Sequence, residues 1–295
     1  MAKLIEFFDK TPEGIVCPHF WMLKFARGCR YGCSYCYLAL TYRIQGVKPH
    51  LYSWNQLKDD FCNFCEKVEY PTLLNAGELT DSFLMENTDN PFSTFIVPLF
   101  ESQNVHKILF LTKSNNLRNF RFLFEQGNVT QTILSWSVNI PKVAHQWEKG
   151  APSPIRRIHA FGNATYCIPG STRIRIDPML PVENWKTKYE DLLKNIFDFG
   201  FPERITLGTL RYFPSLPSRL KKLERDTSLF DLFPAERCAE DGRYRLTDRE
   251  EIYRHMIRLL EEKFGYSRYA LCKETQDVWD NLGLDSKRCL CNCQL

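Results

Sequence analysis

The sequence lacks several features that would assign it to other classes of protein. It has no uninterrupted apolar run close to the roughly 20 residues of a membrane-spanning helix, so no membrane association is expected. The opening residues MAKLIEFFDK lack the continuous apolar stretch of a secretory signal peptide, which makes the cytoplasm the expected location. Internal repeats and low-complexity tracts are also missing. A soluble globular protein is left, and 295 residues suit one large domain.

A strong charge imbalance is missing too. The net charge of +4 permits a polyanionic partner but falls short of the balance expected of a dedicated nucleic-acid-binding domain. Cysteine, in contrast, is abundant, with 12 residues. Because the cytoplasm keeps thiols reduced, we expect these cysteines to bind metal or to take part in redox chemistry rather than to form disulfides.

Short apolar runs alternate with longer amphipathic stretches, a pattern typical of βα units around a parallel sheet. The predicted strands lie within 21–26, 72–77, 106–112, 132–140, 171–180 and 203–212. The predicted helices cover 34–45, 55–68, 91–104, 116–126, 153–164 and 184–199, the last with Asn184 as its cap. We therefore predict an α/β fold, a partial (β/α)6 barrel of about six parallel strands.

The remainder of the chain, residues 213–295, is predicted to pack on the barrel formed by residues 1–212 and not to fold independently. Its first part, residues 214–248, shows no clear periodicity and is expected to be irregular. A helix follows, with Thr247 as its cap and Gly265 at its end.

Three cysteines follow the first predicted strand in the segment FARGCRYGCSYCYL. Thiolates are the usual ligands of iron-sulfur clusters, and Cys29, Cys33 and Cys36 would leave one iron of a 4Fe-4S cluster open to another ligand. Gly28 and Gly32 would let the loop wrap closely around such a cluster. A zinc site or buried structural thiols are the alternatives.

This segment resembles the radical S-adenosylmethionine superfamily, whose signature C-x3-C-x-aromatic-C it matches at every specified position. Within the superfamily the chain is most similar to the spore photoproduct lyase group, from the cluster loop through the fourth or fifth strand. The resemblance implies reductive cleavage of S-adenosylmethionine to a 5'-deoxyadenosyl radical that abstracts hydrogen from a substrate. It further implies a reductant such as flavodoxin or ferredoxin, and a damaged or modified nucleic acid as substrate, as in DNA repair.

The same resemblance assigns roles to residues at successive strand ends. It places Tyr37 and Glu78 on the substrate side as catalytic residues, and it implies that the cofactor is held by Tyr35, Gly77, Glu78, Thr80, Asp81, Lys113 and Ser137. Glu148 resembles the Glu-x-Gly element of the lyases. Taken one at a time, these residues could equally be ordinary strand-end or surface residues; their order along the chain favours the functional interpretation.

One departure from the lyases concerns the reaction itself. Glu78 occupies the position of the cysteine that returns a hydrogen atom to the product radical in the lyases, and a carboxylate cannot replace a thiol in that role. Cys62, Cys65 or Cys167 could supply a thiol from elsewhere. Two alternatives therefore stay open: a radical enzyme that modifies a protein or small molecule, and a non-enzymatic metal-binding interaction protein.

Other cysteines and basic residues carry weaker hypotheses. The set Cys272, Cys289, Cys291 and Cys293 is interpreted either as a second metal site or as a C-terminal plug packed on the barrel. Cys62 and Cys65 are expected to be packed core thiols. The stretch 211–225 and the pair Arg156-Arg157 either face a phosphate backbone or form a solvated surface. Nothing in the sequence indicates the oligomeric state.

Overall fold

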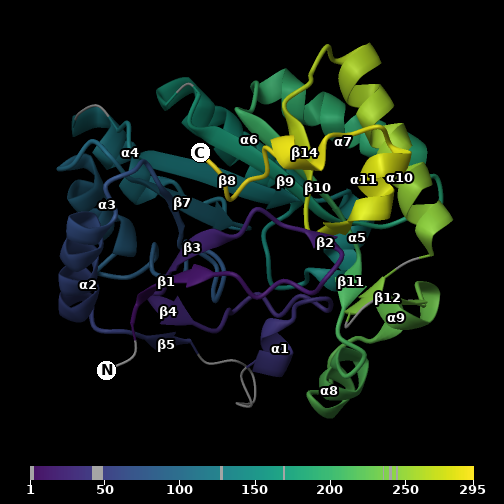
Figure 1. Ribbon diagram of the computed structural model, residues 1–295, viewed down its shortest axis with the longest axis horizontal. Helices are drawn as coiled ribbons and strands as arrows, with labels where there is room; N and C mark the ends of the chain where they lie inside the picture. Colours follow the sequence, from purple (N-terminus) through teal and green to yellow (C-terminus); the bar gives the residue numbers. More distant parts are fainter. Residues whose placement is uncertain are drawn as a thin grey trace.

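A curved sheet of eight strands forms the centre of the computed structural model, which describes residues 3–41, 49–126, 129–168, 170–234, 236–238, 241–243 and 245–295 (Figure 1). In spatial order the strands are β1 (Ile5–Phe8), β3 (Phe20–Leu23), β6 (Leu73–Asn75), β7 (Lys107–Thr112), β8 (Thr132–Val138), β9 (Thr172–Met179), β10 (Arg204–Thr209) and β14 (Tyr269–Leu271). All neighbouring pairs are parallel except β1 and β3. The six predicted parallel strands are confirmed, and β1 and β14 extend the sheet at its two edges.

The strands divide apolar and polar side chains between the two faces of the sheet. In β8, Leu134, Trp136 and Val138 pack in the main hydrophobic core, whereas Ser135 and Ser137 point to the other face. In β9, Ile174 and Ile176 follow the same pattern. Arg175, the residue between them, is the register partner of Ser137 and shares its face. The concave face is therefore polar, and it is the face available to a ligand.

Helices cover the apolar face of the sheet (Figure 1). They are α2 (Trp54–Lys67), α3 (Phe92–Glu101), α4 (Arg118–Gln126), α5 (Pro141–Trp147), α6 (Pro154–Cys167), α7 (Trp185–Phe199) and α10 (Leu246–Arg258). Among the helices predicted in the barrel, that at 34–45 is reduced to α1 (Leu38–Thr41) within the described residues, since residues 42–48 lie outside them. The other five are confirmed; α5 was not predicted.

Two predicted helix caps are wrong. Asn184 precedes α7 with φ +56°, and its side chain makes no capping hydrogen bond. Thr247 lies inside α10, because that helix begins one residue earlier, after Arg245. The predicted end of this helical region is confirmed: a π-helical turn (Leu259–Lys263) follows α10, and Gly265 adopts φ +60°, a conformation that glycine accepts readily.

The segment predicted to be irregular contains short elements. It holds α8 (Leu216–Lys222), α9 (Ser228–Leu232), β12 (Glu236–Cys238) and β13 (Asp241–Arg243). The last two form a small antiparallel sheet with β11 (Arg211–Tyr212), which precedes the segment. Each of these elements is too short to show a periodicity in the sequence. The extension as a whole therefore rests on the barrel, and its strand β14 belongs to the central sheet.

The C-terminal tail, residues 289–295, packs against the polar face of the sheet. The Asn292 backbone N–H donates to Thr206 Oγ1 at 2.8 Å, and Ser135 donates to Asn292 Oδ1 at 3.1 Å. Arg173 Nη1 donates to the Asn292 carbonyl at 2.7 Å and to the Gln294 carbonyl at 2.6 Å. These contacts confirm that the tail forms a plug.

Smaller elements join the two ends of the chain and complete the fold. They are β2 (Ile15–Val16) paired with β15 (Glu274–Thr275), β4 (Ala26–Arg27) paired with β5 (His50–Leu51), α11 (Gln276–Asn281) and a 3₁₀ turn (Ser286–Arg288). Within the described residues, no helix is long and apolar enough to cross a membrane.

Candidate active site

The three cysteines of the predicted cluster loop lie directly after β4, on a loop tied to the turn that follows β6. Gly28 has φ +91° and Gly32 has φ +62°, conformations that favour glycine. The Gly28 N–H donates to the Leu79 carbonyl at 2.8 Å, and the Thr80 hydroxyl donates to the Gly28 carbonyl at 2.6 Å. The loop that carries the thiols is thus fixed to the carboxyl end of the neighbouring strand.

The donor set on this loop fits an iron-sulfur cluster. Cys29, Cys33 and Cys36 are free thiols, Cys33 is buried, and the other two are half-buried. Burial raises the pKa of the Cys33 thiol to about 12 and that of Cys36 to about 11. The charges of the protein do not offset this burial, so thiolates here require positive charge from bound metal. Across the described residues, no three His, Cys, Asp or Glu side chains are placed to hold a single metal ion.

Glu148 brings together residues from different strand ends. Its Oε1 accepts a hydrogen bond from the Tyr35 hydroxyl and lies 3.7 Å from Lys113 Nζ. Its Oε2 lies 2.6 Å from Nη1 of the buried Arg157. Lys113 Nζ in turn donates to Ser137 Oγ at 2.5 Å. Three of the residues predicted to hold the cofactor therefore meet beside the cluster loop.

The charge of Glu148 is stabilised in this position although the side chain is buried. Burial alone would raise its pKa, but Lys113 and Arg157 outweigh that effect and hold the pKa below its usual value. The ammonium of Lys113 also lies 5.7 Å from the centre of the Tyr35 ring. The carboxylate of Glu148 thus orients both a cation and an aromatic ring at the site.

The segment around Glu148 also packs directly on the cluster loop. The Ser34 N–H donates to the Trp147 carbonyl at 2.9 Å. A Cβ atom added at Gly150 would lie 2.4 Å from the Tyr31 carbonyl oxygen, so only glycine permits this approach. The Glu-x-Gly element therefore has a structural explanation in this chain. The glutamate binds Tyr35 and Lys113, and the glycine, which has no side chain, allows the cluster loop to pack closely against it.

The turn after β6 holds the predicted residues Gly77, Thr80 and Asp81 in bracing positions. A Cβ at Gly77 would lie 2.7 Å from Leu111 Cβ, so the turn packs closely on β7. The buried Asp81 accepts from Thr112 Oγ1 at 2.7 Å and from the Lys113 N–H at 2.8 Å. These contacts fix the exits of β6 and β7, while the roles of the three residues toward a cofactor stay predictions.

Tyr37 and Glu78, the two residues predicted on the substrate side, are in contact. The Tyr37 hydroxyl donates to the Glu78 carbonyl at 2.5 Å and lies 3.1 Å from Glu78 Oε1. Lys273, which follows β14, places its Nζ 3.9 Å from the same carboxylate oxygen. The C-terminal extension therefore contributes a cation to the mouth of the barrel, which sequence reasoning missed.

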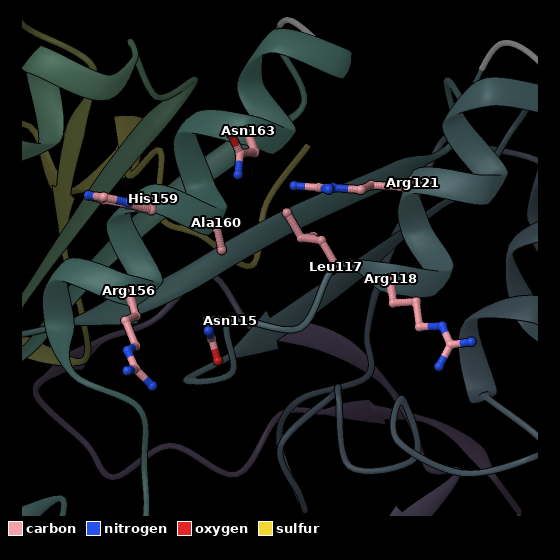
Figure 2. Close-up of a pocket in the computed structure, with 8 residues that line it drawn as sticks. All are labelled: Asn115, Leu117, Arg118, Arg121, Arg156, His159, Ala160 and Asn163. Carbon is pink, nitrogen blue, oxygen red and sulfur yellow. The ribbon is translucent and has the colours of Figure 1, made fainter.

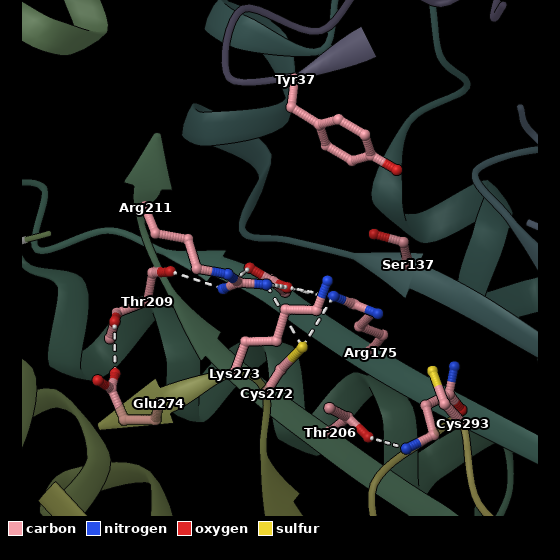
Figure 3. A network of polar contacts seen from close by, with 12 residues as sticks. Tyr37, Ser137, Arg175, Thr206, Thr209, Arg211, Cys272, Lys273, Glu274 and Cys293 are labelled. Carbon is pink, nitrogen blue, oxygen red and sulfur yellow. Dashed lines mark hydrogen bonds and ion pairs between the residues drawn. The ribbon is translucent and has the colours of Figure 1, made fainter. Parts of the chain in front are cut away.

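A second missed group lies next to it, formed by residues of β9 and by Arg211 of β11 (Figure 3). Asp177 Oδ2 accepts from Arg175 Nη2 at 2.6 Å and from Arg211 Nη2 at 2.9 Å. Burial would raise the pKa of Asp177, but the two guanidinium groups hold it well below its usual range. A Cβ at Gly208 would lie 2.6 Å from Asp177 Cγ, so glycine is required there. Charged residues at alternate positions of a predicted strand were the available signal for this group.

Both arginines also reach a thiol. Cys272 Sγ lies 3.0 Å from Arg175 Nη2 and 3.3 Å from Arg211 Nη2 (Figure 3). The thiol sources named from the sequence lie elsewhere: Cys62 and Cys167 are exposed on the outer helices α2 and α6. Cys272 is therefore a thiol that the structure places at the mouth.

The remaining cysteines lie in two settings. Cys65, on α2, packs against the main hydrophobic core, as predicted. Cys62 is exposed, so the prediction that it is a packed core thiol is wrong. Cys289 and Cys291 are buried in the plug, and the Cys293 thiol accepts from Asn75 Nδ2 at 3.8 Å.

Comparisons with known proteins agree with this geometry. A model of the family "Spore photoproduct lyase" matches residues 18–207. A curated spore photoproduct lyase of Clostridium acetobutylicum is 27% identical over 218 residues, which is 71% of this chain and 62% of the relative. This chain therefore spans about three fifths of that relative's length.

Solved structures of spore photoproduct lyase show the same fold. The complex with dinucleoside spore photoproduct has a TM-score of 0.68 at 17% identity, over 90% of this chain and 78% of that chain. A variant with bound AdoMet and dinucleoside spore photoproduct has a TM-score of 0.67 at 17% identity, over 85% of this chain and 75% of that chain.

Proposed function

The chain belongs to the spore photoproduct lyase family, and on that premise we propose that it is a radical S-adenosylmethionine enzyme that abstracts hydrogen from a substrate at the barrel mouth. The observation that carries the proposal is the convergence of Tyr35, Lys113 and Ser137 on Glu148 and one another beside three free thiols. Each of these side chains comes from a different strand exit, as a distributed cofactor site requires.

Cys29, Cys33 and Cys36 would hold a 4Fe-4S cluster, with one iron left open for the cofactor. When bound, the cluster and S-adenosylmethionine supply one-electron cleavage of the sulfonium and hence a carbon-centred radical. Lys113, held by Ser137, presents an ammonium for the cofactor carboxylate, and Tyr35 presents an aromatic ring whose hydroxyl is fixed by Glu148. These residues position the cofactor before the reaction and limit the access of water.

For the substrate we favour a damaged or modified nucleic acid, with DNA repair as the biological role. Relatives of this fold are described with dinucleoside spore photoproduct. In this chain Lys273, Arg175 and Arg211 supply positive charge at the mouth, which suits a phosphate-bearing substrate. Glu78 in place of the lyase cysteine supports the second candidate, modification of a protein or small molecule, because it removes the thiol from its position in the lyases.

Anaerobic reconstitution tests the radical enzyme against the non-enzymatic metal-binding alternative. We expect four irons per chain, the visible absorption of a 4Fe-4S cluster and release of 5'-deoxyadenosine from S-adenosylmethionine on reduction with dithionite. Cys36→Ala should lose at least about 90% of all three signals because a cluster held by two thiolates is incomplete. Cys167→Ala, on the exposed surface of α6, is the matched control and should retain them. A Cys36→Ala protein with wild-type cluster content and turnover would contradict the assignment.

The same preparation tests two further proposals. The first is that flavodoxin or ferredoxin is the physiological reductant in the cytoplasm, the proposed location. Either protein should then support turnover in place of dithionite, and a failure of both would contradict this. The second is a metal centre at Cys272, Cys289, Cys291 and Cys293, whose thiols lie near enough for Cys289, Cys293 and Cys272 to affect the pKa of Cys291. Metal binding would have to draw these thiols closer together, because within the described residues no three of them are placed to hold one ion. This second centre predicts metal beyond four irons that a Cys291→Ser variant loses; four irons alone would exclude it.

A further inference from the structure

A basic groove lies between α4 and α6, next to the barrel mouth but outside it (Figure 2). Its volume is about 490 Å³. The polar residues that line it are Arg118, Arg121, Arg156, His159, Asn115 and Asn163. Figure 2 shows Arg118 and Arg121 on α4, with Arg121 directed toward α6, and Arg156, His159 and Asn163 on α6. The groove is thus lined by cations and amides from two separate helices.

The charge of the groove is not neutralised by the protein. Arg118, Arg121 and Arg156 are exposed, and none has a carboxylate partner within the part of the chain that the structure describes. No aspartate or glutamate lines the groove either. Some other surface cations do have carboxylate partners, for example Lys186 with Glu251 and Lys263 with Glu190. Guanidinium groups without a carboxylate partner give this surface a positive potential that attracts an anion.

The position of the groove connects it to the candidate active site. Asn115 follows Lys113 by two residues, and Arg156 directly precedes Arg157, the partner of Glu148. Both α4 and α6 begin near the carboxyl edge of the sheet and run away from it, so the groove leads from the mouth down the outer surface. From Arg156 to Asn163 the α6 wall rises by about 10 Å, which is longer than one phosphate group.

The chemistry of the lining selects among anions. Guanidinium groups bind phosphate oxygens with two parallel hydrogen bonds, and amide side chains suit sugar and phosphate oxygens. The one aromatic side chain in the lining, His159, packs against Phe199 with 4.3 Å between ring centres. No other aromatic face lines the groove, so base stacking is not expected there. The lining therefore suits a backbone rather than bases.

We propose that this groove binds the sugar-phosphate backbone of a nucleic-acid strand that flanks the nucleotide reacting at the mouth. The inference rests on the proposed function, because it takes nucleic acid as the substrate class. It adds a contact surface on α4 and α6, outside the set of residues expected to hold the cofactor. Because only the backbone is contacted there, the groove should bind nucleic acid without sequence preference. A substrate longer than a dinucleotide would then bind more tightly than the reacting unit alone.

The test compares two triple variants with equal loss of charge. The groove variant is R118Q/R121Q/R156Q, and the control is K67Q/R258Q/R268Q, whose residues are exposed and lie outside the groove. The probe is a fluorescein-labelled single-stranded DNA of about 16 nucleotides, followed by fluorescence anisotropy at several salt concentrations. Loss of three phosphate contacts should lower the salt slope by about 2 and weaken binding roughly ten- to a hundredfold at 0.1 M salt.

Three outcomes separate the two levels of the proposal. If the groove variant binds more weakly and the control does not, the inference is supported, and 5'-deoxyadenosine release without DNA should stay at the wild-type level because these arginines do not touch the cofactor residues. If wild type and both variants bind equally well, the groove is not the backbone site although nucleic acid is bound. If the wild type binds no oligonucleotide even at low salt, the nucleic-acid substrate itself is wrong, and the groove proposal falls with it.

Discussion

Glu148 has only 1% of its surface exposed, yet its carboxylate is charged. Tyr35 donates a hydrogen bond to it, and Lys113 and Arg157 form ion pairs with it. A buried carboxylate is tolerated only when its partners are close and well aligned, because the loss of hydration is costly. Here the partners include side chains expected to hold the cofactor. The ion pairs and the hydrogen bond of Glu148 therefore affect both the stability of the fold and the positions of the side chains expected to hold the cofactor.

Replacement of Glu148 tests this connection. Glu148→Gln keeps the shape but removes the charge, which leaves the buried Arg157 without its carboxylate partner. We expect the free energy of unfolding to fall by about 3 to 5 kcal/mol, measured by urea denaturation, and the affinity for S-adenosylmethionine to fall as Tyr35 and Lys113 lose their anchor. Glu251→Gln, which breaks the exposed pair with Lys186, is the control and should cost less than about 1 kcal/mol. An equal effect of both changes would refute the special role of Glu148.

The same residue predicts a pH dependence of stability. The pKa of Glu148 is lower in the folded protein than its usual value of 4.5. A group of this kind stabilises the fold above its unfolded pKa, and the stabilisation disappears as the pH falls through the folded pKa. Between pH 5 and lower values the wild type should therefore lose stability more steeply than Glu148→Gln. Parallel curves of unfolding free energy against pH for the two proteins would contradict this.

At the scale of elements, the tail fills one end of the barrel interior, and the candidate active site lies at the other end. The plug occupies the polar interior near the amino ends of β8, β9 and β10, where Arg173 and Arg204 both donate to the Gln294 carbonyl. The carboxyl ends carry the candidate active site. Because the inner faces of β8 to β10 present serine, threonine and arginine rather than leucine, the interior needs hydrogen-bonding partners, and the tail backbone supplies them.

Deletion of residues 289–295 tests the plug. It removes the carbonyl acceptors of two buried arginines and leaves an unfilled interior, so we expect a loss of several kcal/mol of unfolding free energy. Differential scanning calorimetry and urea denaturation would measure it. Deletion of the exposed Leu295 alone should be nearly neutral. If the seven-residue deletion unfolds at the wild-type temperature, the tail is not a structural plug.

At the scale of the whole molecule, the C-terminal extension contributes strand β14 to the central sheet. Its strand β14 pairs with β10, and its buried Glu274 accepts from Thr209 Oγ1 at 3.1 Å. Contacts of this kind cross the proposed boundary between residues 1–212 and 213–295. The two parts are therefore expected to fold together.

Expression of residues 1–212 alone tests this organisation. The fragment would expose the edge of β10 and lose the plug, so we expect it to aggregate or to lack cooperative unfolding. The full chain should unfold in a single transition when far-UV circular dichroism and tryptophan fluorescence are compared. A soluble fragment with its own sharp transition, or two transitions in the full chain, would show two independent domains.

Local patterns allowed much of the fold and part of the site to be predicted. β7 and β8 are apolar runs of ordinary strand length, and Cys29, Cys33 and Cys36 are spaced within one loop, so both can be recognised from neighbouring residues alone. β14 has only three residues, and α5 has seven, which is too little for a periodic signal. The cap at Asn184 fails because its backbone is left-handed, which no local pattern announces.

The sequence by itself therefore determined the parallel α/β arrangement and the close spacing of Cys29, Cys33 and Cys36, since each depends on near neighbours. The choice of Tyr35, Lys113 and Ser137 came from the resemblance to the lyase group. Only the tertiary structure decided that Glu148 joins them, that Arg175, Arg211 and Cys272 meet at the mouth, and that the tail fills the barrel. These contacts join residues many positions apart whose meeting depends on the curvature of the sheet and on burial, and neither is encoded in any single stretch of chain.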